Sequence, residues 1–420
     1  MKRFLFLGLS ATTAFSEGVY LHEKSPLLAP TNDHPSLVFY NVAGGVFLKT
    51  QESKIQTSLS NTSYFVKAYL TNDGSKDRNG SARLGLSQGK SFVVSKVPDI
   101  FFNYAFKENL SLGFSLTCPY GLGVKYEPAW FGRYEMLKAQ LETTDFTPYI
   151  SYKVTPTFSI GAGVTVRHVY SEFEKAIDFG SLGGGTAQQD DGAVKAKMRG
   201  NSFALNAGIY WKNERSFLGV SWQQSDKVKQ KGPVTFTLSR SGRNVLGVTG
   251  AFKDTRVHTS YKLPAKILLH GGYSLTNSWR LLADTLFMTW STIKTQDLVF
   301  ENSSQSTEVI NHYYRNTWHF NVVSEVTVTE KIRAWFGVGF SQTPVKTQYR
   351  RPELPDSNRK SLWMGAQYSV TKNCYAAITA VYFHYNNATI DLAATTATGR
   401  LQARAKANVM AVKASLSLKI

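Results

Sequence analysis

The chain has 420 residues, of which 42% are hydrophobic, with a formal net charge of +19 at pH 7 and a mean hydropathy of −0.22. No stretch approaches the roughly 18–20 continuous apolar residues of a membrane-spanning helix, which excludes a helical span. The 48 Lys and Arg residues are scattered rather than gathered on one element, which argues against nucleic-acid binding.

The first residues have the pattern of a secretory signal peptide. Lys2 and Arg3 form a charged start, residues 4–15 an apolar stretch, and Ala14-Phe15-Ser16 a cleavage site with small outer residues. We therefore predict a signal peptide over residues 1–16 and export from a bacterial cell. An uncleaved anchor is the alternative, although the apolar stretch is short for a span.

Residues 17–50 are distinguished by what they lack. They contain Pro26, Pro30 and Pro35 and no apolar–polar alternation, so they do not predict a strand. We predict that they form an ordered segment inside the domain that follows, where they act as a plug. A flexible tail is the alternative.

From residue 51 onward, many segments alternate between apolar and polar residues, as in strands with two different faces. In the last segment, Met410, Val412 and Ala414 alternate with Lys413 and Ser415. Rows of the same kind start at Leu110, Ile160, Phe203, Ile332 and Leu362. The polar faces offer little for a second sheet to pack on, which favours a membrane barrel with a polar lumen over a soluble sandwich.

Short polar turns recur between these strands, and much longer connections lie between successive pairs, which is the layout of an outer-membrane β-barrel. Six turns, each joining two strands, give twelve; one strand before and one after make fourteen. We predict an all-β fold, a transmembrane 14-stranded antiparallel β-barrel over residues 51–420, with both chain ends on the short-turn side. The turns are Lys107-Glu108-Asn109, Thr155-Pro156-Thr157, Lys212-Asn213-Glu214, Leu275-Thr276-Asn277-Ser278, Thr329-Glu330-Lys331 and Thr371-Lys372-Asn373.

In this layout the two cysteines, Cys118 and Cys374, lie at opposite membrane faces. That distance is far beyond the ~7 Å Cα separation that a disulfide allows, so no bridge is predicted. The strong positive charge has three interpretations that remain open: an anion-attracting lumen, contact with lipopolysaccharide phosphates, or solvated loops.

Catalytic motifs are missing from the sequence. The histidines show no HExxH spacing and there is no Gly-x-Ser-x-Gly elbow, so no catalytic residue, metal ligand or cofactor is predicted. Gly183-Gly184-Gly185 falls in a long connection and not between a strand and a helix, which argues against a phosphate-binding loop.

Several ordered pieces of the chain together resemble the FadL-type outer-membrane transporters of long-chain fatty acids and other hydrophobic compounds. No single piece is specific, but their order and spacing are. They are Gly18–Glu23, Val38–Gly44, Val97-Pro98 through Ser115, Pro119–Gly123, Leu263-Pro264, Trp279, Asp284, Trp290-Ser291, Thr343–Val345, Pro352, Pro355-Asp356, Arg359, Tyr382 and His384.

The resemblance implies a fourteen-stranded barrel with an N-terminal plug, or hatch, in which Asn41, Val42 and Ala43 match the family's Asn-Pro-Ala segment. It also implies a third strand that is kinked inward, so that substrate leaves sideways into the membrane. The family uses neither nucleotide nor metal. As partners of this chain we predict a hydrophobic small molecule, outer-membrane lipid and lipopolysaccharide, and we expect the chain to act as a monomer.

The predicted lateral opening falls at Pro119, Tyr120, Gly121, Leu122 and Gly123. Proline removes a donor from the strand ladder, and the glycines leave no side chain to block a gap. An ordinary strand end that leads into a loop would explain the same residues.

Two groups of predicted substrate-binding residues follow. The loop over residues 124–142 is rich in apolar side chains, and by resemblance Trp130, Phe131 and Leu137 would line a capture groove; packing within the loop is the alternative. In the lumen, a substrate carboxylate would need a cation. Arg167 is predicted to face inward and is the candidate.

Two more basic residues are candidates for the lumen, and the sequence departs from the family pattern in three places. Arg404 and Lys406 are also predicted to face the lumen, where a solvated charge is the alternative role. The plug is shorter than usual, Val42 replaces the typical proline, and Ile420 replaces a terminal aromatic residue. A diverged member could therefore carry aromatic or aliphatic hydrocarbons, or be a porin or adhesin barrel.

Overall fold

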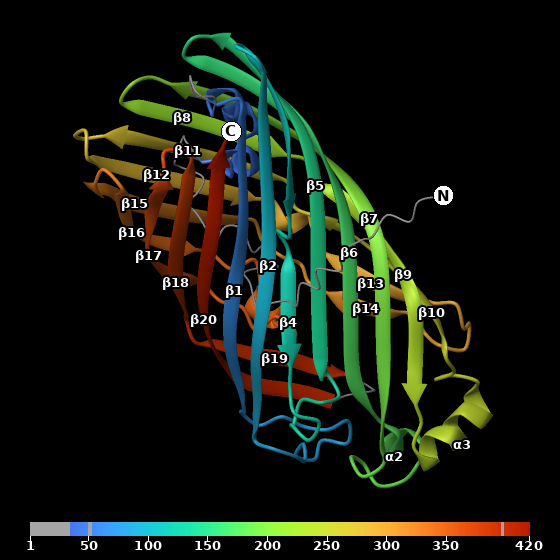
Figure 1. The fold of residues 1–420 in the computed structure, drawn as a ribbon. Coiled ribbons are helices and arrows are strands. Elements are labelled where there is room, and N and C mark those ends of the chain that lie inside the picture. The colour runs from blue at the N-terminus through green and yellow to red at the C-terminus, as the bar shows by residue number, and fades with distance from the viewer. Residues whose placement is uncertain (1–33, 49–52, 396–398) are drawn as a thin grey trace.

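The computed structural model describes residues 34–48, 53–395 and 399–420, and its strands form one closed antiparallel barrel (Figure 1). The predicted signal peptide and residues 17–33 lie outside this part of the chain. β1 (Ile55–Asn72) pairs on one side with β2 (Gln88–Lys107) and on the other with β20 (Gly399–Lys419), which closes the wall. Closure pairs the first and last strands of the sheet, so neither of them presents an open edge to the membrane.

The other strands follow in chain order around the wall. They are β3 (Leu110–Thr117), β4 (Gly121–Lys125), β5 (Lys138–Thr155), β6 (Phe158–Asp178), β7 (Asp191–Lys212), β8 (Ser216–Gln223), β9 (Asp226–Thr237), β10 (Thr255–Leu263), β11 (Lys266–Ser274), β12 (Trp279–Met288), β13 (Thr295–Phe300), β14 (Glu308–Asn311), β15 (Thr317–Thr329), β16 (Ile332–Ser341), β17 (Arg359–Thr371), β18 (Cys374–Tyr385) and β19 (Ala388–Thr395).

The predicted fourteen wall strands are confirmed, although six of them are interrupted. The pairs β3/β4, β8/β9, β10/β11, β12/β13, β14/β15 and β18/β19 each continue one wall strand, so the twenty segments reduce to fourteen. All six predicted turns join successive strands. Pro119 and Pro264 fall in two of the interruptions, as expected for a residue that cannot donate to the ladder.

Burial alternates along the strands, which separates a lumen face from a lipid face. In β5, Thr147, Tyr149 and Ser151 are buried, whereas Phe146 and Ile150 are 43% and 45% exposed. The alternation predicts that Arg167 and Lys413 point into the lumen. This prediction is confirmed, because both side chains are buried.

The prediction that Arg404 and Lys406 face the lumen is wrong. Both are exposed, and they keep the phase of Met410, which is 47% exposed on the lipid face. Ala403, Ala405 and other small residues occupy the inward positions of this part of β20. Arg404 instead pairs with Asp73 outside the wall.

Short helices lie at the two ends of the barrel. α2 (Phe179–Leu182) and α3 (Arg240–Thr249) lie at the long-loop end, and the Asp178 and Ser239 side chains cap them by accepting from Ser181 N and Gly242 N. Three further turns are 3-10 helices: η3 (Val42–Phe47), η4 (Trp290–Thr292) and η5 (Thr347–Tyr349). None of the helices in the described residues is long and apolar enough to cross a membrane.

Cys118 and Cys374 are both free thiols, as predicted. Cys118 follows β3 toward the long-loop end, and Cys374 begins β18 at a short turn. Their separation along the wall agrees with the strand layout.

Residues 34–48 form α1 (Leu37–Tyr40) followed by η3, near the end of the barrel that holds the C-terminus (Figure 1). Leu37, Val38, Val42 and Ala43 are all buried. The segment contacts β3, β5, β6 and β7. The side chains that it meets there belong to the lumen face, so residues 34–48 lie within the barrel.

Candidate functional site

Asn41 is the residue that fastens residues 34–48 to the wall. Its Nδ2 donates to Ile209 O at 3.0 Å and to Val220 O at 3.3 Å, and its Oδ1 accepts from Ala43 N at 3.0 Å. The amide therefore links β7 and β8 and also stabilises the first turn of η3. The carbonyl of Ala43 accepts from Ser151 Oγ and Ser159 Oγ on the opposite strands, at 2.7 and 2.6 Å.

Three lumen-facing glycines make room for this segment. A Cβ atom on Gly161 would lie 2.6 Å from Ala43 N and 2.7 Å from Val42 C; one on Gly208 would lie 2.2 Å from Asn41 Oδ1. A Cβ atom on Gly219 would lie 2.6 Å from Asn41 Nδ2 and 2.3 Å from His270 Nε2. Because the atoms facing Gly161 are backbone, a larger residue there must displace the segment.

The third wall strand is interrupted at Cys118-Pro119-Tyr120. β3 pairs with β5 up to Thr117 and Asp145, and β4 resumes with Gly121 opposite Glu142. Three residues therefore face only Thr143 and Thr144, which makes a bulge. Thr143 binds the loose backbone, since its Oγ1 accepts from Tyr120 N at 2.9 Å.

On the long-loop side of this bulge, β2 and β4 are not paired with each other. β2 pairs with β3 from Lys107 to Ile100, whereas Gln88–Asp99 pair with β1 on the other side only. In the described part of the chain, no paired register joins β4 to β2. Lys125 N instead donates to Ser91 Oγ at 3.0 Å. This stretch of wall is therefore held by fewer backbone hydrogen bonds than its neighbours.

Tyr120, the inward residue of the bulge, lies over a buried ion cluster. Its ring centroid is 4.7 Å from Arg167 Cζ. Arg167 donates to both oxygens of Asp145, at 2.8 and 2.7 Å, and to both oxygens of Asp226, at 2.6 and 2.7 Å. Ser202 Oγ also donates to Asp226. The guanidinium charge is thus compensated by two carboxylates, which weakens the case for Arg167 as the partner of a substrate.

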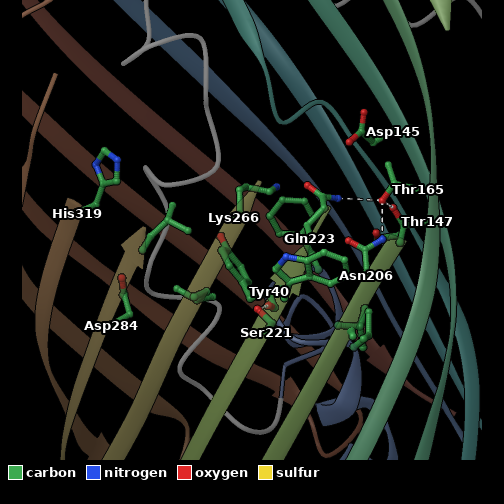
Figure 2. A pocket seen from close by; sticks show the side chains of 18 of the residues that line it. Tyr40, Asp145, Thr147, Thr165, Asn206, Ser221, Gln223, Lys266, Asp284 and His319 are labelled. Atoms are coloured by element: carbon green, nitrogen blue, oxygen red, sulfur yellow. Dashed lines mark hydrogen bonds between the residues drawn. The ribbon is translucent and has the colours of Figure 1, made fainter. Parts of the chain in front are cut away.

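A small cavity lies between the ion cluster and the N-terminal segment (Figure 2). It has a volume of about 60 Å³ and is lined by Phe39, Tyr40 and Val42 from the segment and by side chains of seven or more wall strands. Lys266 is the one lysine or arginine among its lining residues. The Lys266 Nζ atom is 5.7 Å from the ring centroids of both Phe39 and Tyr120.

Several polar side chains of this cavity wall are hydrogen-bonded to one another. Thr165 Oγ1 meets Thr147 Oγ1 at 2.9 Å and accepts from Asn206 Nδ2 and Gln223 Nε2, at 2.8 and 3.0 Å (Figure 2). Asp284 also lines the cavity and accepts from Asn321 Nδ2. The cavity therefore combines one cationic side chain, the carboxylates of Asp145 and Asp284, and neutral polar groups beside the aromatic rings of the segment.

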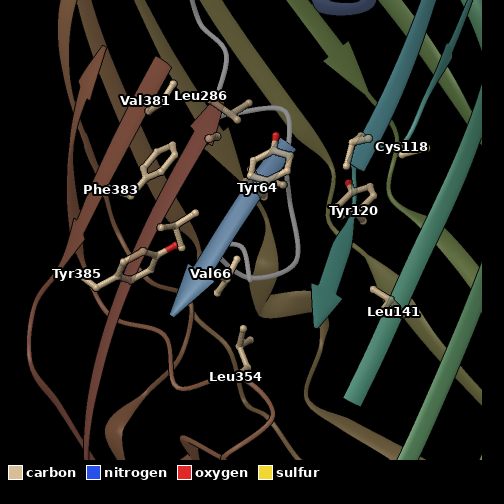
Figure 3. Close-up of a cluster of buried hydrophobic side chains, with 14 of the residues drawn as sticks. Tyr64, Val66, Cys118, Tyr120, Leu141, Leu286, Leu354, Val381, Phe383 and Tyr385 are labelled. Atoms are coloured by element: carbon tan, nitrogen blue, oxygen red, sulfur yellow. The ribbon is translucent and has the colours of Figure 1, made fainter. Parts of the chain in front are cut away.

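Two further cavities, of about 90 and 70 Å³, adjoin each other toward the long-loop end. Phe173 and Ile310 line both cavities. Trp290 and Tyr314 line the cavity of about 90 Å³. The Trp290 ring lies 6.4 Å from that of Tyr120 and 6.1 Å from that of Tyr314. Apolar side chains of several strands, Tyr64, Leu141 and Phe383 among them, fill the surrounding lumen (Figure 3).

The predicted capture residues lie in a loop that is shorter than expected, because β4 and β5 leave only residues 126–137 between them. Trp130 and Phe131 are fully buried, and Leu137 is partly buried against the same core. Trp130 stacks on Tyr126 at 4.3 Å and donates from Nε1 to Met136 O. The described conformation therefore matches packing within the loop, and the capture role of these three residues remains a prediction.

Ionic contacts fasten this loop over the barrel. Arg133 donates to Asp191 Oδ2 at 2.7 Å and to Leu84 O at 2.8 Å, which joins three extracellular connections. Tyr134 donates to Asp191 Oδ1. Burial and this hydrogen bond raise the pKa of the Tyr134 phenol above its ordinary value, so it stays a neutral donor at physiological pH.

The described residues, 34–48, 53–395 and 399–420, contain no group of three or more His, Cys, Asp or Glu side chains that could hold a metal ion. Sequence reasoning did not single out Lys266, and it noted Trp290 only as part of a resemblance. The one available signal for Lys266 was its place directly after the Leu263-Pro264 interruption.

A closed barrel with an apolar outer face and short turns at one end defines a β-barrel of the bacterial outer membrane. Residues 29–418 match the family described as outer membrane protein transport protein (OMPP1/FadL/TodX). The chain belongs to this family of outer-membrane transporters of hydrophobic compounds, as its sequence predicted.

Individual relatives are distant but cover most of the chain. A provisionally assigned outer membrane protein of Neisseria meningitidis serogroup B is 23% identical over 381 residues, 84% of this chain and 81% of that protein. The long-chain fatty acid transport protein of Escherichia coli is 22% identical over 330 residues, 69% and 70% of the two chains.

Two solved structures share the fold. A FadL homologue of Pseudomonas aeruginosa has a TM-score of 0.86 at 20% identity and covers 98% of this chain and 100% of its own. The P. putida toluene transporter TodX has a TM-score of 0.68 at 13% identity, with 97% and 96% covered.

The glycine at position 161 offers a direct test of where the N-terminal segment lies. We expect Gly161→Val to displace residues 41–43, because the Cβ would meet their backbone, and to raise ion conductance in planar bilayers by at least about tenfold. Ala162→Val, which places the same valine side chain on the exposed face of the same strand, is the control. Unchanged conductance in a folded Gly161→Val barrel would contradict the placement.

The ion cluster predicts a stability effect. Arg167→Met should leave Asp145 and Asp226 uncompensated and lower the free energy of unfolding by about 3–5 kcal/mol, the usual cost of breaking a buried pair. Urea titration of the barrel in lipid vesicles measures this value. Arg404→Met, which removes a pair at the exposed surface, should have no measurable effect.

Proposed function

We propose that this protein is a channel for facilitated diffusion of hydrophobic small molecules, most specifically long-chain fatty acids, and that it is not an enzyme and needs no metal or cofactor. The observation that carries the proposal is the break in pairing between β2 and β4, beside the buried ring of Tyr120. A gap in an otherwise closed wall gives a hydrophobic molecule a route to the membrane without crossing a polar lumen.

The proposed route joins the three cavities. Substrate is captured beneath the extracellular loops, where Trp130, Phe131 and Leu137 form the predicted groove. It then passes the apolar cavities at Trp290 and Tyr314 and reaches the cavity beside Lys266. It leaves sideways at Pro119–Gly123, next to Tyr120.

Movement of the N-terminal segment is part of this proposal. The cavities of about 60, 70 and 90 Å³ are each well below the ~300–1,000 Å³ of a pocket that holds a drug-sized ligand. Passage of a fatty acid therefore requires side chains and residues 34–48, the hatch, to shift. Asn41 and Ala43, with their hydrogen bonds to four strands, are the contacts that would break and re-form.

For the carboxylate end of the substrate, we propose Lys266 in place of Arg167. Lys266 is among the residues that line the cavity, and Arg167 is not; the four hydrogen bonds of Arg167 go to Asp145 and Asp226. The similarity to the Escherichia coli long-chain fatty acid transport protein supports this substrate class. An aromatic or aliphatic hydrocarbon, as suggested by the likeness to TodX, would have no need of Lys266.

A filled lumen argues against a water-filled porin or a purely adhesive barrel. The segment inside the barrel and the packed apolar side chains leave no wide aqueous path among the described residues. We also propose that the chain acts as a monomer, because β1 and β20 pair with each other and so neither end strand of the sheet is free to pair with another chain.

The lateral route predicts a loss of transport from one added side chain. Gly121→Phe should reduce uptake of radiolabelled palmitate by at least about tenfold, because a ring beside the bulge fills the gap in the wall, while folding stays intact. The heat-dependent gel mobility of the barrel reports folding. Ala162→Phe, on the lipid face of an intact strand, is the control, and full uptake by a folded Gly121→Phe protein would refute the route.

The carboxylate contact predicts a difference between two ligands. Lys266→Met should weaken palmitate binding about tenfold or more, as expected for loss of a charge-assisted contact worth ~1.5–3 kcal/mol, and should leave toluene binding unchanged. Calorimetry on protein in detergent measures both. Lys406→Met, an exposed base outside the wall, serves as the control. Equal palmitate binding by the two variants would show that Lys266 does not hold the carboxylate.

A further inference from the structure

A group of five basic side chains lies on the outside of the wall, on three neighbouring strands. They are Arg199 on β7, Lys227, Lys229 and Lys231 on β9, and Lys262 on β10, and all five are exposed. They form what we call the basic wall patch. Its position is independent of the cavities and of the lateral route.

The register brings like charges together within the patch. Arg199 lies opposite Lys231, and Lys227 lies opposite Lys262. Like charges that face each other directly across strands are destabilising. Such an arrangement favours a bound anion that compensates both members of each pair.

Carboxylates of the protein supply little of that compensation. Glu172, the nearest acidic residue on β6, is engaged by Lys138 and Lys195 at 3.0 and 2.8 Å. An open groove of about 790 Å³ runs along the patch; Arg199, Lys229, Lys231 and two histidines line it, with Asp297 as the one acidic lining residue. The groove therefore has a net positive charge.

The patch lies at the border of the apolar band. On β7 the outward residues are apolar from Trp211 to Phe203, and Asn201 and Arg199 follow. Nine residues of strand span roughly 26 Å along the strand, or about 20 Å across a membrane at the usual tilt. The bases thus begin where the hydrocarbon of the outer leaflet ends.

The same change occurs on the two neighbouring strands. Trp222, 41% exposed, precedes the lysines of β9, and Ile267 and Leu269, 43% and 41% exposed, follow Lys262. Aromatic and aliphatic side chains therefore lie next to the charges, on the side toward the short turns. A molecule with acyl chains and a phosphorylated head would match both surfaces at once.

We propose that the basic wall patch is a binding site for the phosphorylated headgroup of an outer-leaflet glycolipid of the lipid A type. The acyl chains lie against the apolar outward residues of β7, β8 and β11, and the phosphates lie between the paired bases. This bound lipid neutralises the like-charge pairs and holds this side of the barrel in the outer leaflet.

Native mass spectrometry of the full chain in detergent tests the proposal. The probes are diphosphoryl lipid A, the same lipid without phosphates, and inorganic phosphate. The triple variant Lys227→Gln, Lys229→Gln, Lys231→Gln should bind diphosphoryl lipid A at least about tenfold more weakly than the unchanged protein. The matched control Arg240→Gln, Lys253→Gln, Lys346→Gln removes the same charge from exposed positions beyond the wall and should bind normally.

Three results would overturn the proposal. One is equal lipid A binding by the triple variant and the unchanged protein. Another is equally tight binding of the lipid without phosphates, which would leave the bases no role. The third is full displacement of lipid A by millimolar inorganic phosphate, which would identify a free-anion site. Heat-dependent gel mobility confirms that the variants remain folded, and palmitate binding should be unaffected in both.

Discussion

Lipid offers no hydrogen-bond partners, so the backbone of a membrane strand must pair within the wall. This constraint explains the closure of the wall, in which β1 pairs with β2 on one side and with β20 on the other. It also makes the break between β2 and β4 costly. Thr143 and Ser91 supply side-chain hydrogen bonds at that point, which is how the protein maintains an unpaired stretch in its wall.

The break, the ion cluster and the plug are physically connected through Tyr120 and Lys266. Tyr120 contacts the Arg167 guanidinium and the Trp290 ring, and Lys266 lies between Tyr120 and Phe39 of the N-terminal segment. A shift of the segment would therefore change the surroundings of the bulge directly. This contiguity supports coupling of plug movement to the lateral exit.

The basic residues that give the chain its strong positive charge have different local roles. Arg167 and Lys413 are inside the barrel and paired with carboxylates, Arg133 fastens extracellular loops, and the basic wall patch faces outward. A single explanation for the net charge of +19 is therefore too simple. The ion pairs favour a structural role for Arg167 and Lys413, and the exposed bases of the basic wall patch are those to which we assign a lipid-directed role.

The sequence by itself determined the number of wall strands, all six turns and most of the side-chain faces, because alternation and turn chemistry are local properties. It failed for Arg404 and Lys406, where small inward residues and charged outward ones reverse the usual pattern at the membrane border. Only the tertiary structure decided what each inward side chain meets. Arg167 and Asp226 are 59 positions apart in the sequence. Asn41 reaches Ile209 on β7 and Val220 on β8, which lie 168 and 179 positions away. Such contacts depend on strand register and on the path of the N-terminal segment, and local sequence patterns predict neither.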